Sequence, residues 1–171
     1  MESRNQISRK SWSYNTVTAF LSALYITISI GVLILDRVTK LYALEHFGVE
    51  QKVFQFLSFE LVINRGISWG ILNSSSTFTF LCVVLLTLLV TCALGIYAYR
   101  RILQGYTIVG ELLVFTGSLS NILDRVLYNG VVDFILVHIQ SWSWPVFNIA
   151  DSAIVLGVVC MMIQLIKQQN A

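Results

Sequence analysis

Aspartates are the residues of this sequence whose type and position could support chemistry. The chain contains four of them, which are Asp36, Asp124, Asp133 and Asp151. Each lies near the end of a long apolar stretch or in a segment that connects two such stretches. An ionisable side chain inside a membrane costs roughly 2.5–3.5 kcal/mol on insertion scales, so it is a functional candidate by default. The alternative interpretation is that these aspartates cap helices and anchor them at a membrane surface.

Local spacing brings an amide beside two of these carboxylates. The pairs are Asn121 with Asp124 and Asn148 with Asp151. Residues three apart share one face of a helix, so two helices would each present an amide and a carboxylate in the same direction. Two carboxylates held close together share one proton, because both cannot ionise easily. Such a pair can hydrolyse a peptide bond without a metal ion, since one member deprotonates water while the other polarises the carbonyl.

The other reactive residue types do not predict a metal site. The two histidines, His46 and His138, are far apart in the sequence, and the chain has no HExxH or CxxC pattern. Its three cysteines lie in apolar stretches, where cysteine usually behaves as a small hydrophobic residue. A net charge of +2 without a basic patch gives no indication of nucleic-acid binding. We therefore expect no metal, no cofactor and no nucleic-acid partner.

The elements that must position the aspartates are membrane helices. Hydrophobic residues make up 56% of the 171 residues and charged residues only 12%, against about 25% charged in a soluble domain. A helix needs about 20 mostly apolar residues to cross the hydrocarbon core. Four stretches qualify, at residues 17–35, 78–99, 106–123 and 146–166. We expect one all-α membrane domain with four transmembrane helices.

The distribution of lysine and arginine predicts the orientation of these helices. Of the 11 positive residues, six lie in the N-terminal tail, in the Arg100–Arg101 turn and at Lys167. Because positive charge in short loops favours the cytoplasm, we place both termini there and all four aspartates at the extracytoplasmic face. Residues 36–70 then form a long outer connection. Its apolar middle, Val53–Ile63, predicts one or two short strands, a small extracytoplasmic β-element between the first two helices.

At these residues the sequence resembles the lipoprotein signal peptidases (signal peptidase II) of bacteria. Five segments carry the resemblance in the family's order: Asp36–Lys40 (D-x-x-[ST]-K), Asn64–Gly70 (N-x-G-x-x-F-G), Asn121–Arg125 (N-x-x-D-R), Val131–Ile135 (V-V-D-F-I) and Phe147–Ser152 (F-N-x-A-D-S). Trp69 stands where the family usually has phenylalanine. Each segment alone is a weak signal, but five in order on a chain of this length indicate membership.

The resemblance implies an aspartic endopeptidase of the bacterial cytoplasmic membrane. Its substrates would be diacylglyceryl-modified prolipoproteins, cut just before the lipidated cysteine by a monomer that needs no cofactor. The resemblance also implies that Asp133 and Asp151 are the catalytic pair. From the residues alone, Asp124 is an equal candidate. The neighbouring Arg125 lets Asp124 form a structural ion pair with another helix, which is the interpretation we prefer.

Supporting roles are expected for seven further residues, counting Asp124. The amides of Asn64, Asn121 and Asn148 would hold the substrate backbone and orient the carboxylates. Asp36 and Lys40 would brace the outer end of the first helix, and Arg125 would support the site.

Two other functions are compatible with part of this pattern. A proton-coupled transporter or channel component would also use intramembrane acids, but only Glu111 lies well inside a predicted span. A serine–lysine peptidase would combine Ser68 or Ser152 with Lys40, although no serine–lysine signature is visible.

Overall fold

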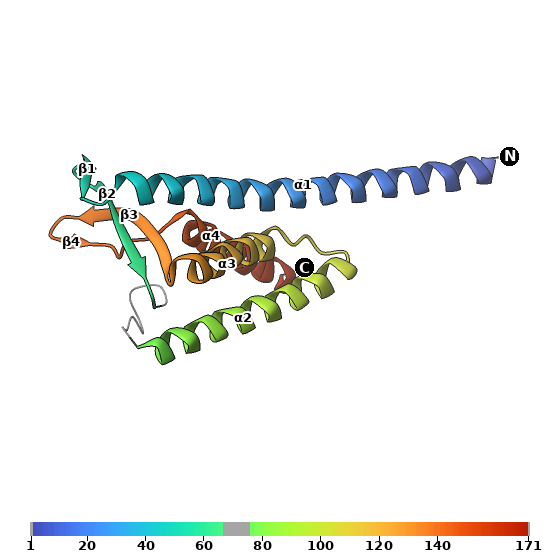
Figure 1. Cartoon of the computed structure of the whole chain (residues 1–171). Helices are drawn as coiled ribbons and strands as arrows, with labels where there is room; N and C mark the ends of the chain where they lie inside the picture. Colours follow the sequence, from blue (N-terminus) through green and yellow to red (C-terminus); the bar gives the residue numbers. More distant parts are fainter. Residues whose placement is uncertain (1, 67–75, 171) are drawn as a thin grey trace.

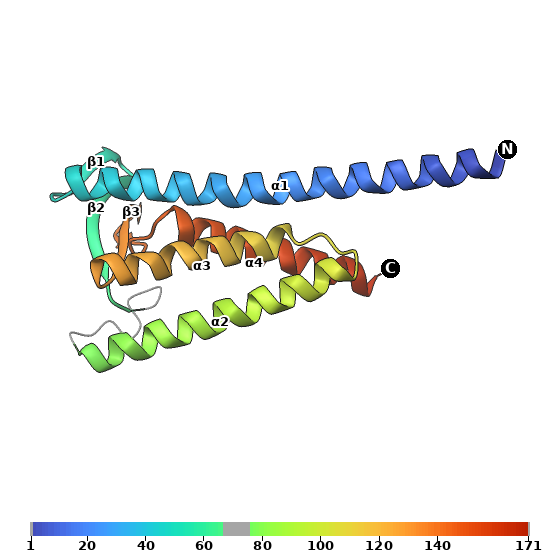
Figure 2. The same ribbon diagram turned by 45° about the vertical axis from the view of Figure 1, so that its right-hand side comes forward.

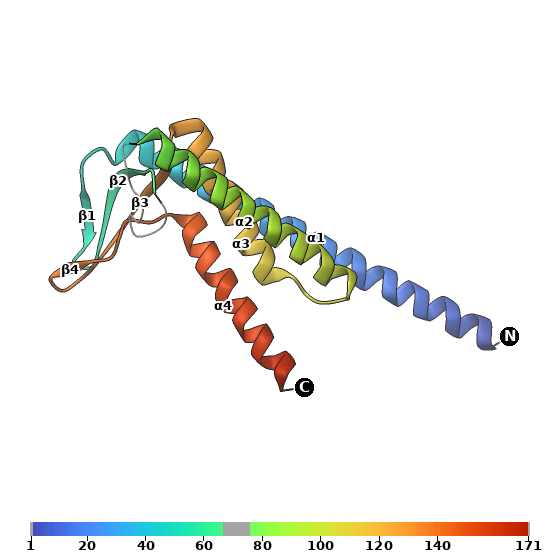
Figure 3. The ribbon, with the colours of Figure 1, turned by 90° about the horizontal axis from the view of Figure 1, so that it is seen from below.

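The computed structural model describes residues 2–66 and 76–170, with side chains from Phe20 onward. These residues form α1 (Glu2–His46), β1 (Gln51–Phe54), β2 (Leu57–Asn64), α2 (Thr77–Leu103), α3 (Val109–Tyr128), β3 (Val131–Ile139), β4 (Trp142–Ser143) and α4 (Ile149–Gln169). α3 lies between α1 and α2 (Figure 1, Figure 2), whereas α4 packs against α3 and lies to one side of the other helices, at an angle to them (Figure 3). All strands gather at one end of the bundle, here called the sheet end, away from both chain ends (Figure 3).

Three helices of the described chain are long and apolar enough to cross a membrane. They are Phe20–His46 of α1, all of α2 and all of α4. The predicted third span, residues 106–123, also forms a helix, but α3 is less apolar because it carries Glu111, Asp124 and Arg125. These three charged side chains are all buried, and α3 packs against each of the other helices.

The first helix continues further than its apolar stretch predicts. The sequence analysis began a surface connection at Asp36, yet α1 continues through Lys40 to His46. That boundary was wrong because charge ends a hydrophobic stretch without ending a helix. No glycine or proline interrupts residues 32–46, and the Asp36 carboxylate pairs with Lys40 one turn later at 2.8 Å.

The predicted β-element is present, but it accounts for only half of the sheet. β1 and β2 come from the segment between α1 and α2, as expected, whereas β3 and β4 come from the segment between α3 and α4. The four strands form one antiparallel sheet in the order β1-β2-β3-β4. The sequence analysis assigned no strand to residues 131–139, although that run is rich in valine, isoleucine and phenylalanine, which favour strands.

A small aromatic core fixes the sheet to the end of α1. Ala43, Phe47 and Phe134 are buried together, with Phe59 packed against them. The rings of Phe47 and Phe59 stack at a centroid distance of 4.9 Å. Side chains alternate across a strand, so the burial of Phe134 against α1 directs the preceding residue, Asp133, to the opposite face.

Glycines permit very close packing between α3 and α4. A Cβ atom on Gly157 would lie 2.6 Å from the carbonyl oxygen of Gly110, and one on Gly110 would lie 2.8 Å from that of Gly157. One on Gly117 would lie 2.5 Å from the carbonyl oxygen of Ala150. Small residues at such crossings are a common means of packing membrane helices. Here the contact of Gly117 with Ala150 holds the start of α4 against α3, and the contact of Gly110 with Gly157 continues this close packing further along α4.

Gly157→Ala is therefore expected to lower the melting temperature of the purified protein. Forcing one methyl group into a packed helix contact costs about 1–3 kcal/mol. The matched control is Gly31→Ala, because a Cβ on Gly31 meets nothing within 4 Å and alanine favours a helix over glycine. Thermal unfolding of both variants in detergent measures the difference; equal melting temperatures would contradict the packing argument.

Candidate active site

Asp133 lies on β3 beside the end of β2. In the antiparallel register Asn64 is opposite Val131, so Asn64 and Asp133 are diagonal neighbours on one face of the sheet. The Asn64 amide donates a hydrogen bond to Asp133 Oδ2 at 3.1 Å. The turn before β3 passes close to β2, since a Cβ on Gly130 would lie only 2.6 Å from the Ile63 side chain. Asp133 as a whole residue is 2% exposed.

Asp151 lies in the first turn of α4, in a capping box. Asn148 is the N-cap residue, and its Oδ1 accepts the backbone N–H of Asp151 at 2.8 Å. Asp151 Oδ2 in turn accepts the backbone N–H of Asn148 at 3.3 Å. This reciprocal pair satisfies two N–H groups that the start of a helix leaves open. The Asn-x-x-Asp spacing is thus a capping motif as well as a means of placing a carboxylate.

Asn148 connects the two aspartates directly. While its Oδ1 and backbone N–H bind Asp151, its Nδ2 donates to Asp133 Oδ1 at 2.7 Å. The same amide lies 3.3 Å from the carbonyl oxygen of Val132 and 3.2 Å from Asn121 Oδ1. Asn148 is completely buried. One side chain therefore sets the relative position of a strand carboxylate and a helix carboxylate.

Asn121 of α3 orients the other side of Asp151. Its Nδ2 donates to Asp151 Oδ1 at 2.8 Å. Its Oδ1 accepts from Lys40 Nζ at 2.9 Å and from Asn148. Because a lysine ammonium can only donate, Lys40 fixes which end of the Asn121 amide faces it and leaves the NH₂ group toward Asp151.

Asp124 faces α1 and belongs to a buried cluster of charges. It forms ion pairs with Arg37 and, at 2.7 Å, with Lys40, and its Oδ2 also accepts the backbone N–H of Val132. The predicted ion pair with another helix is present, but its partners come from α1 and not from Arg125. The sequence analysis did not select Arg37, although its position within the Asp36–Lys40 segment was an available signal.

Asp36 belongs to the same cluster and joins α1 to two other helices. Its Oδ1 accepts the backbone N–H of Ala150 in the first turn of α4 at 2.8 Å, and its Oδ2 accepts from Ser120 Oγ at 2.6 Å. Asp36 and Lys40 thus attach the C-terminal part of α1 to α3 and α4. Their supporting role at the site stays a prediction. The importance of Ser120 was missed, because a serine in a helix gives no sign of its partner.

Arg125 is buried between α3 and the chain that follows β2. Its guanidinium donates to the carbonyl oxygen of Gly66 at 2.8 Å and to that of Asn121 at 3.2 Å. The backbone N–H of Gly66 donates to Asn64 Oδ1 at 2.9 Å. Arg125 therefore holds Gly66, whose backbone N–H in turn fixes the Asn64 side chain. This position beside the site is the one expected for a residue that supports it.

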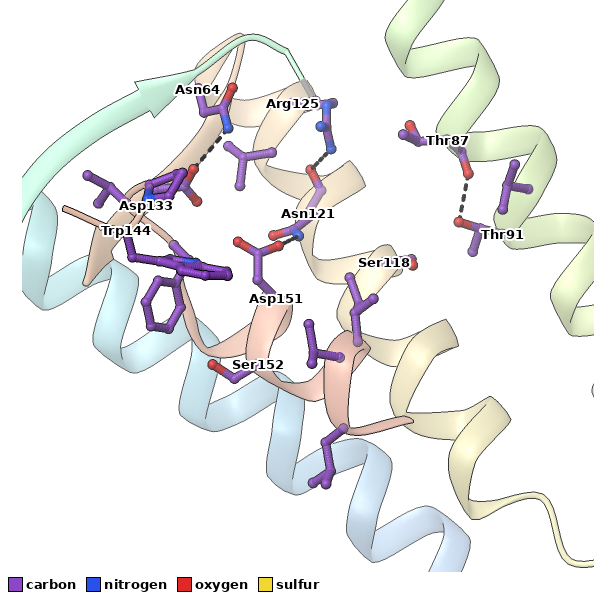
Figure 4. Close-up of a pocket in the computed structure, with 18 of the residues that line it drawn as sticks. Asn64, Thr87, Thr91, Ser118, Asn121, Arg125, Asp133, Trp144, Asp151 and Ser152 are labelled. Carbon is purple, nitrogen blue, oxygen red and sulfur yellow. Dashed lines mark hydrogen bonds between the residues drawn. The ribbon is translucent and has the colours of Figure 1, made fainter. Parts of the chain in front are cut away.

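A cavity of about 770 Å³ opens in front of the two aspartates, between α2, α3 and α4. Asp133 and Asp151 both line it, together with Asn64, Asn121 and Arg125. Figure 4 shows the side chains of Asn121 and Asp151 directed toward one another, with Asp133 and Asn64 above them. Asp36, Lys40, Asp124 and Asn148 are not among the lining residues and lie behind this wall. The two candidate partners of Asp151 therefore differ in position, because Asp133 lines the cavity and Asp124 does not.

The environment of Asp133 favours its protonated form. Burial, followed by the charge of Asp151, raises the pKa of Asp133 to about 7, although hydrogen bonds from Asn64 and Asn148 and the charge of Lys40 oppose the change. A carboxyl group that holds its proton near neutral pH can donate it to a substrate carbonyl. In the described part of the chain, no group of three or more histidine, cysteine or acidic residues is arranged to bind a metal ion.

The residues of the two alternative functions have other partners. Lys40 Nζ binds Asp36, Asp124 and Asn121. Ser152 donates to the carbonyl oxygen of Asn148 in its own helix at 3.1 Å, whereas Ser68 lies outside the described residues. Glu111, the proposed relay acid, pairs with Arg101 of α2 at 2.8 Å at the end of the bundle opposite the sheet.

Membrane-spanning helices, a surface sheet and two buried carboxylates on one cavity define a class of membrane-embedded hydrolases. Comparison with known proteins narrows the class. The family model for signal peptidase (SPase) II matches residues 28–167. The lipoprotein signal peptidase of Aquifex aeolicus (strain VF5) is 34% identical over 145 residues, which cover 82% of this chain and 84% of that protein. That of Staphylococcus aureus (strain bovine RF122 / ET3-1) is 36% identical over 149 residues, covering 85% and 89%.

Solved structures agree with this result. A bacterial membrane enzyme solved by the in meso method at 2.3 Å resolution superposes with a TM-score of 0.69 at 31% sequence identity, and the match covers 86% of this chain and 90% of that one. The chain belongs to the signal peptidase II family and is a protease of the membrane. The resemblance inferred from the five short segments is confirmed.

Proposed function

We propose that this protein is an aspartic endopeptidase that removes the signal peptide from diacylglyceryl-modified prolipoproteins, cutting before the lipidated cysteine, with Asp133 and Asp151 as its catalytic pair. The observation that carries the proposal is that these two carboxyl groups face one cavity and are tied together through Asn148. The names of the related proteins support the substrate class.

In the proposed mechanism one proton is divided between the two aspartates. Ionised Asp151 takes a proton from water, whose oxygen attacks the scissile carbonyl carbon, while Asp133 gives its proton to the carbonyl oxygen. Asp151 then protonates the leaving nitrogen as the C–N bond breaks, and Asp133 recovers its proton from the resulting hydroxyl group. The side-chain amide of Asn121 and the backbone N–H of Asn148 hold the Asp151 carboxylate through both steps.

We place the protein in the bacterial cytoplasmic membrane as a monomer with four transmembrane helices, in which α3 crosses the membrane together with α1, α2 and α4. The charged groups of α3 support this placement, since Glu111 pairs with α2 and Asp124 with α1, which removes the cost of exposing them to lipid. Both chain ends and the C-terminal end of α2 lie away from the sheet end (Figure 1), and the last turn of α2 carries Arg100 and Arg101. This distribution of positive charge supports cytoplasmic termini and an extracytoplasmic site.

Cleavage of a purified, lipidated prolipoprotein in detergent tests the function. We expect a mobility shift on a gel without any ion gradient and without inhibition by serine-directed reagents. Lack of cleavage, combined with proton movement in sealed vesicles, would instead identify a transporter. Loss of cleavage after treatment with a serine-directed reagent would identify a serine–lysine enzyme.

The pH dependence of cleavage is a further prediction. The pKa of Asp133 is raised to about 7, and the reaction needs its protonated form. As the pH rises through about 7 the proton is lost, so kcat/KM is expected to fall about tenfold per pH unit above that value. Asn64→Ala removes a hydrogen bond that favours the ionised form, so the fall is expected to begin at higher pH. Measurement of kcat/KM from pH 5 to 9 for the wild type and Asn64→Ala tests this prediction. A fall at the same pH in both proteins would contradict the role of Asp133 as the proton donor.

A further inference from the structure

The part of the cavity between α2 and α4 differs in character from the part that the aspartates line. Its walls are mostly apolar side chains of α2 and α4, which are Leu86, Val90, Val155, Leu156 and Val159. Two threonines of α2, Thr87 and Thr91, also line it. Figure 4 shows them one turn apart on the face of α2 that is turned toward α3 and its Ser118. The proposed mechanism does not use either hydroxyl group.

Both hydroxyl groups have already donated their only proton. Thr87 Oγ1 lies 3.0 Å from the carbonyl oxygens of Val83 and Val84, and Thr91 Oγ1 lies 2.7 Å from that of Thr87. A hydroxyl carries one donor and two acceptor positions. Bonding back to the same helix therefore leaves oxygen lone pairs but no proton for a ligand. In this cavity the two threonines offer acceptors only.

The spacing of these acceptors matches an extended peptide. Four helical residues rise about 6 Å. In an extended chain, N–H groups on the same edge recur every second residue, at about 6.6–6.8 Å. An unwound segment inside a membrane must find hydrogen-bond partners in protein, since lipid provides none. Two acceptors one helical turn apart can receive two alternate N–H groups of such a segment.

We propose that Thr87 and Thr91 bind the substrate's signal peptide in an extended conformation, by accepting backbone N–H groups from two residues that precede the scissile bond. The inference rests on the proposed function. α2 starts at the sheet end, so Thr87 lies nearer that end than Thr91. A signal peptide whose N-terminus is cytoplasmic runs from the aspartates along α2, so Thr91 binds the residue two positions before the one that Thr87 binds.

The chain offers a matched control for the hydrogen bond between a threonine hydroxyl and the carbonyl oxygen of the preceding helical turn. Thr39 of α1 donates to the carbonyl oxygens of Leu35 at 2.8 Å and Asp36 at 3.1 Å, as Thr87 does in α2, but it does not line the cavity. Thr39→Val therefore removes the same kind of local hydrogen bond without affecting a bound peptide. Thr87→Ser and Thr91→Ser retain the hydroxyl and serve as conservative variants.

The test uses lipidated substrate peptides in which one backbone amide is replaced by an ester. The ester is placed in turn at each of the four residues before the cysteine, which removes one N–H at a time. Thr87→Val and Thr91→Val are each expected to lower kcat/KM about 3- to 10-fold on the all-amide substrate, the effect of one neutral hydrogen bond. Thr39→Val and the serine variants are expected to match the wild type.

The pattern across the esters is decisive. For each valine variant the loss is expected to disappear with one particular ester substrate, and the two positions are expected to differ by two residues. Unchanged kcat/KM in both valine variants, or an equal loss with every ester, would show that the hydroxyls only pack the helix. Failure of the proposed function is a separate result, in which the wild type cuts no lipidated substrate at all.

Discussion

Asp133→Asn and Asp151→Asn are each expected to reduce processing of a lipidated prolipoprotein by at least about 10³-fold, while the protein still folds and inserts. General acid–base catalysis contributes roughly 10²–10⁴-fold, and each change removes a group needed in both steps of the mechanism. Asparagine keeps nearly the same shape, so the capping box of α4 retains an acceptor at position 151. Initial rates on a purified substrate, with melting temperatures in parallel, measure the effect.

Two further variants make this result specific. Glu45→Gln is the matched control, because it neutralises an exposed carboxylate at the end of α1 and is expected to leave the rate unchanged. Asp124→Asn tests the other candidate. Full activity in Asp133→Asn together with a catalytic loss in a folded Asp124→Asn protein would show that the pair was assigned to the wrong aspartate.

Among the substitutions considered, Lys40→Met is expected to lower the stability of the protein most. The Lys40 side chain is 1% exposed and bridges Asp36 and Asp124, which are both fully buried. Without it, Arg37 alone must compensate two buried carboxylates. Removing one partner of a buried ion pair costs about 3–5 kcal/mol, because the remaining charge stays uncompensated. We expect a markedly lower melting temperature and poor accumulation in the membrane.

A matched lysine and a second mutation complete that test. Lys52→Met removes an exposed ammonium group from β1 and is expected to have little effect, as surface charges contribute little. Adding Asp124→Asn to Lys40→Met removes one uncompensated charge, so part of the lost stability is expected to return. A Lys40→Met protein that melts like the wild type would contradict the cluster's structural role.

Sequence reasoning was most successful where a pattern reports on local structure. The three most apolar stretches predicted helices, and the apolar residues of Val53–Ile63 predicted one or two short strands, which the structure has as β1 and β2. It failed to place the end of α1, because hydropathy marks the limit of an apolar surface and not of a helix. It also missed β3, whose valine-rich run resembles the end of a membrane helix as closely as a buried strand.

The candidate site was predicted as a set of residues but not as an arrangement. Spacing of three places Asn121 and Asp124 on one helical face, yet it cannot tell which neighbour each will meet, and in the structure one faces Asp151 while the other faces α1. The resemblance selected Asp133 over Asp124. The multiple bonds of Asn148 depend on three separate segments meeting, and no local pattern contains that information. The catalytic roles remain a prediction.

The position of Asn148 has a consequence for biosynthesis. Its bonds join the start of α4 to β3 and α3, and α4 follows the other three helices in the chain. On a ribosome the carboxylates therefore cannot come into alignment before this last helix has been translated and docked. Under the proposed mechanism, we therefore expect a nascent chain to have no protease activity until α4 has docked, because that step also brings the two carboxylates together.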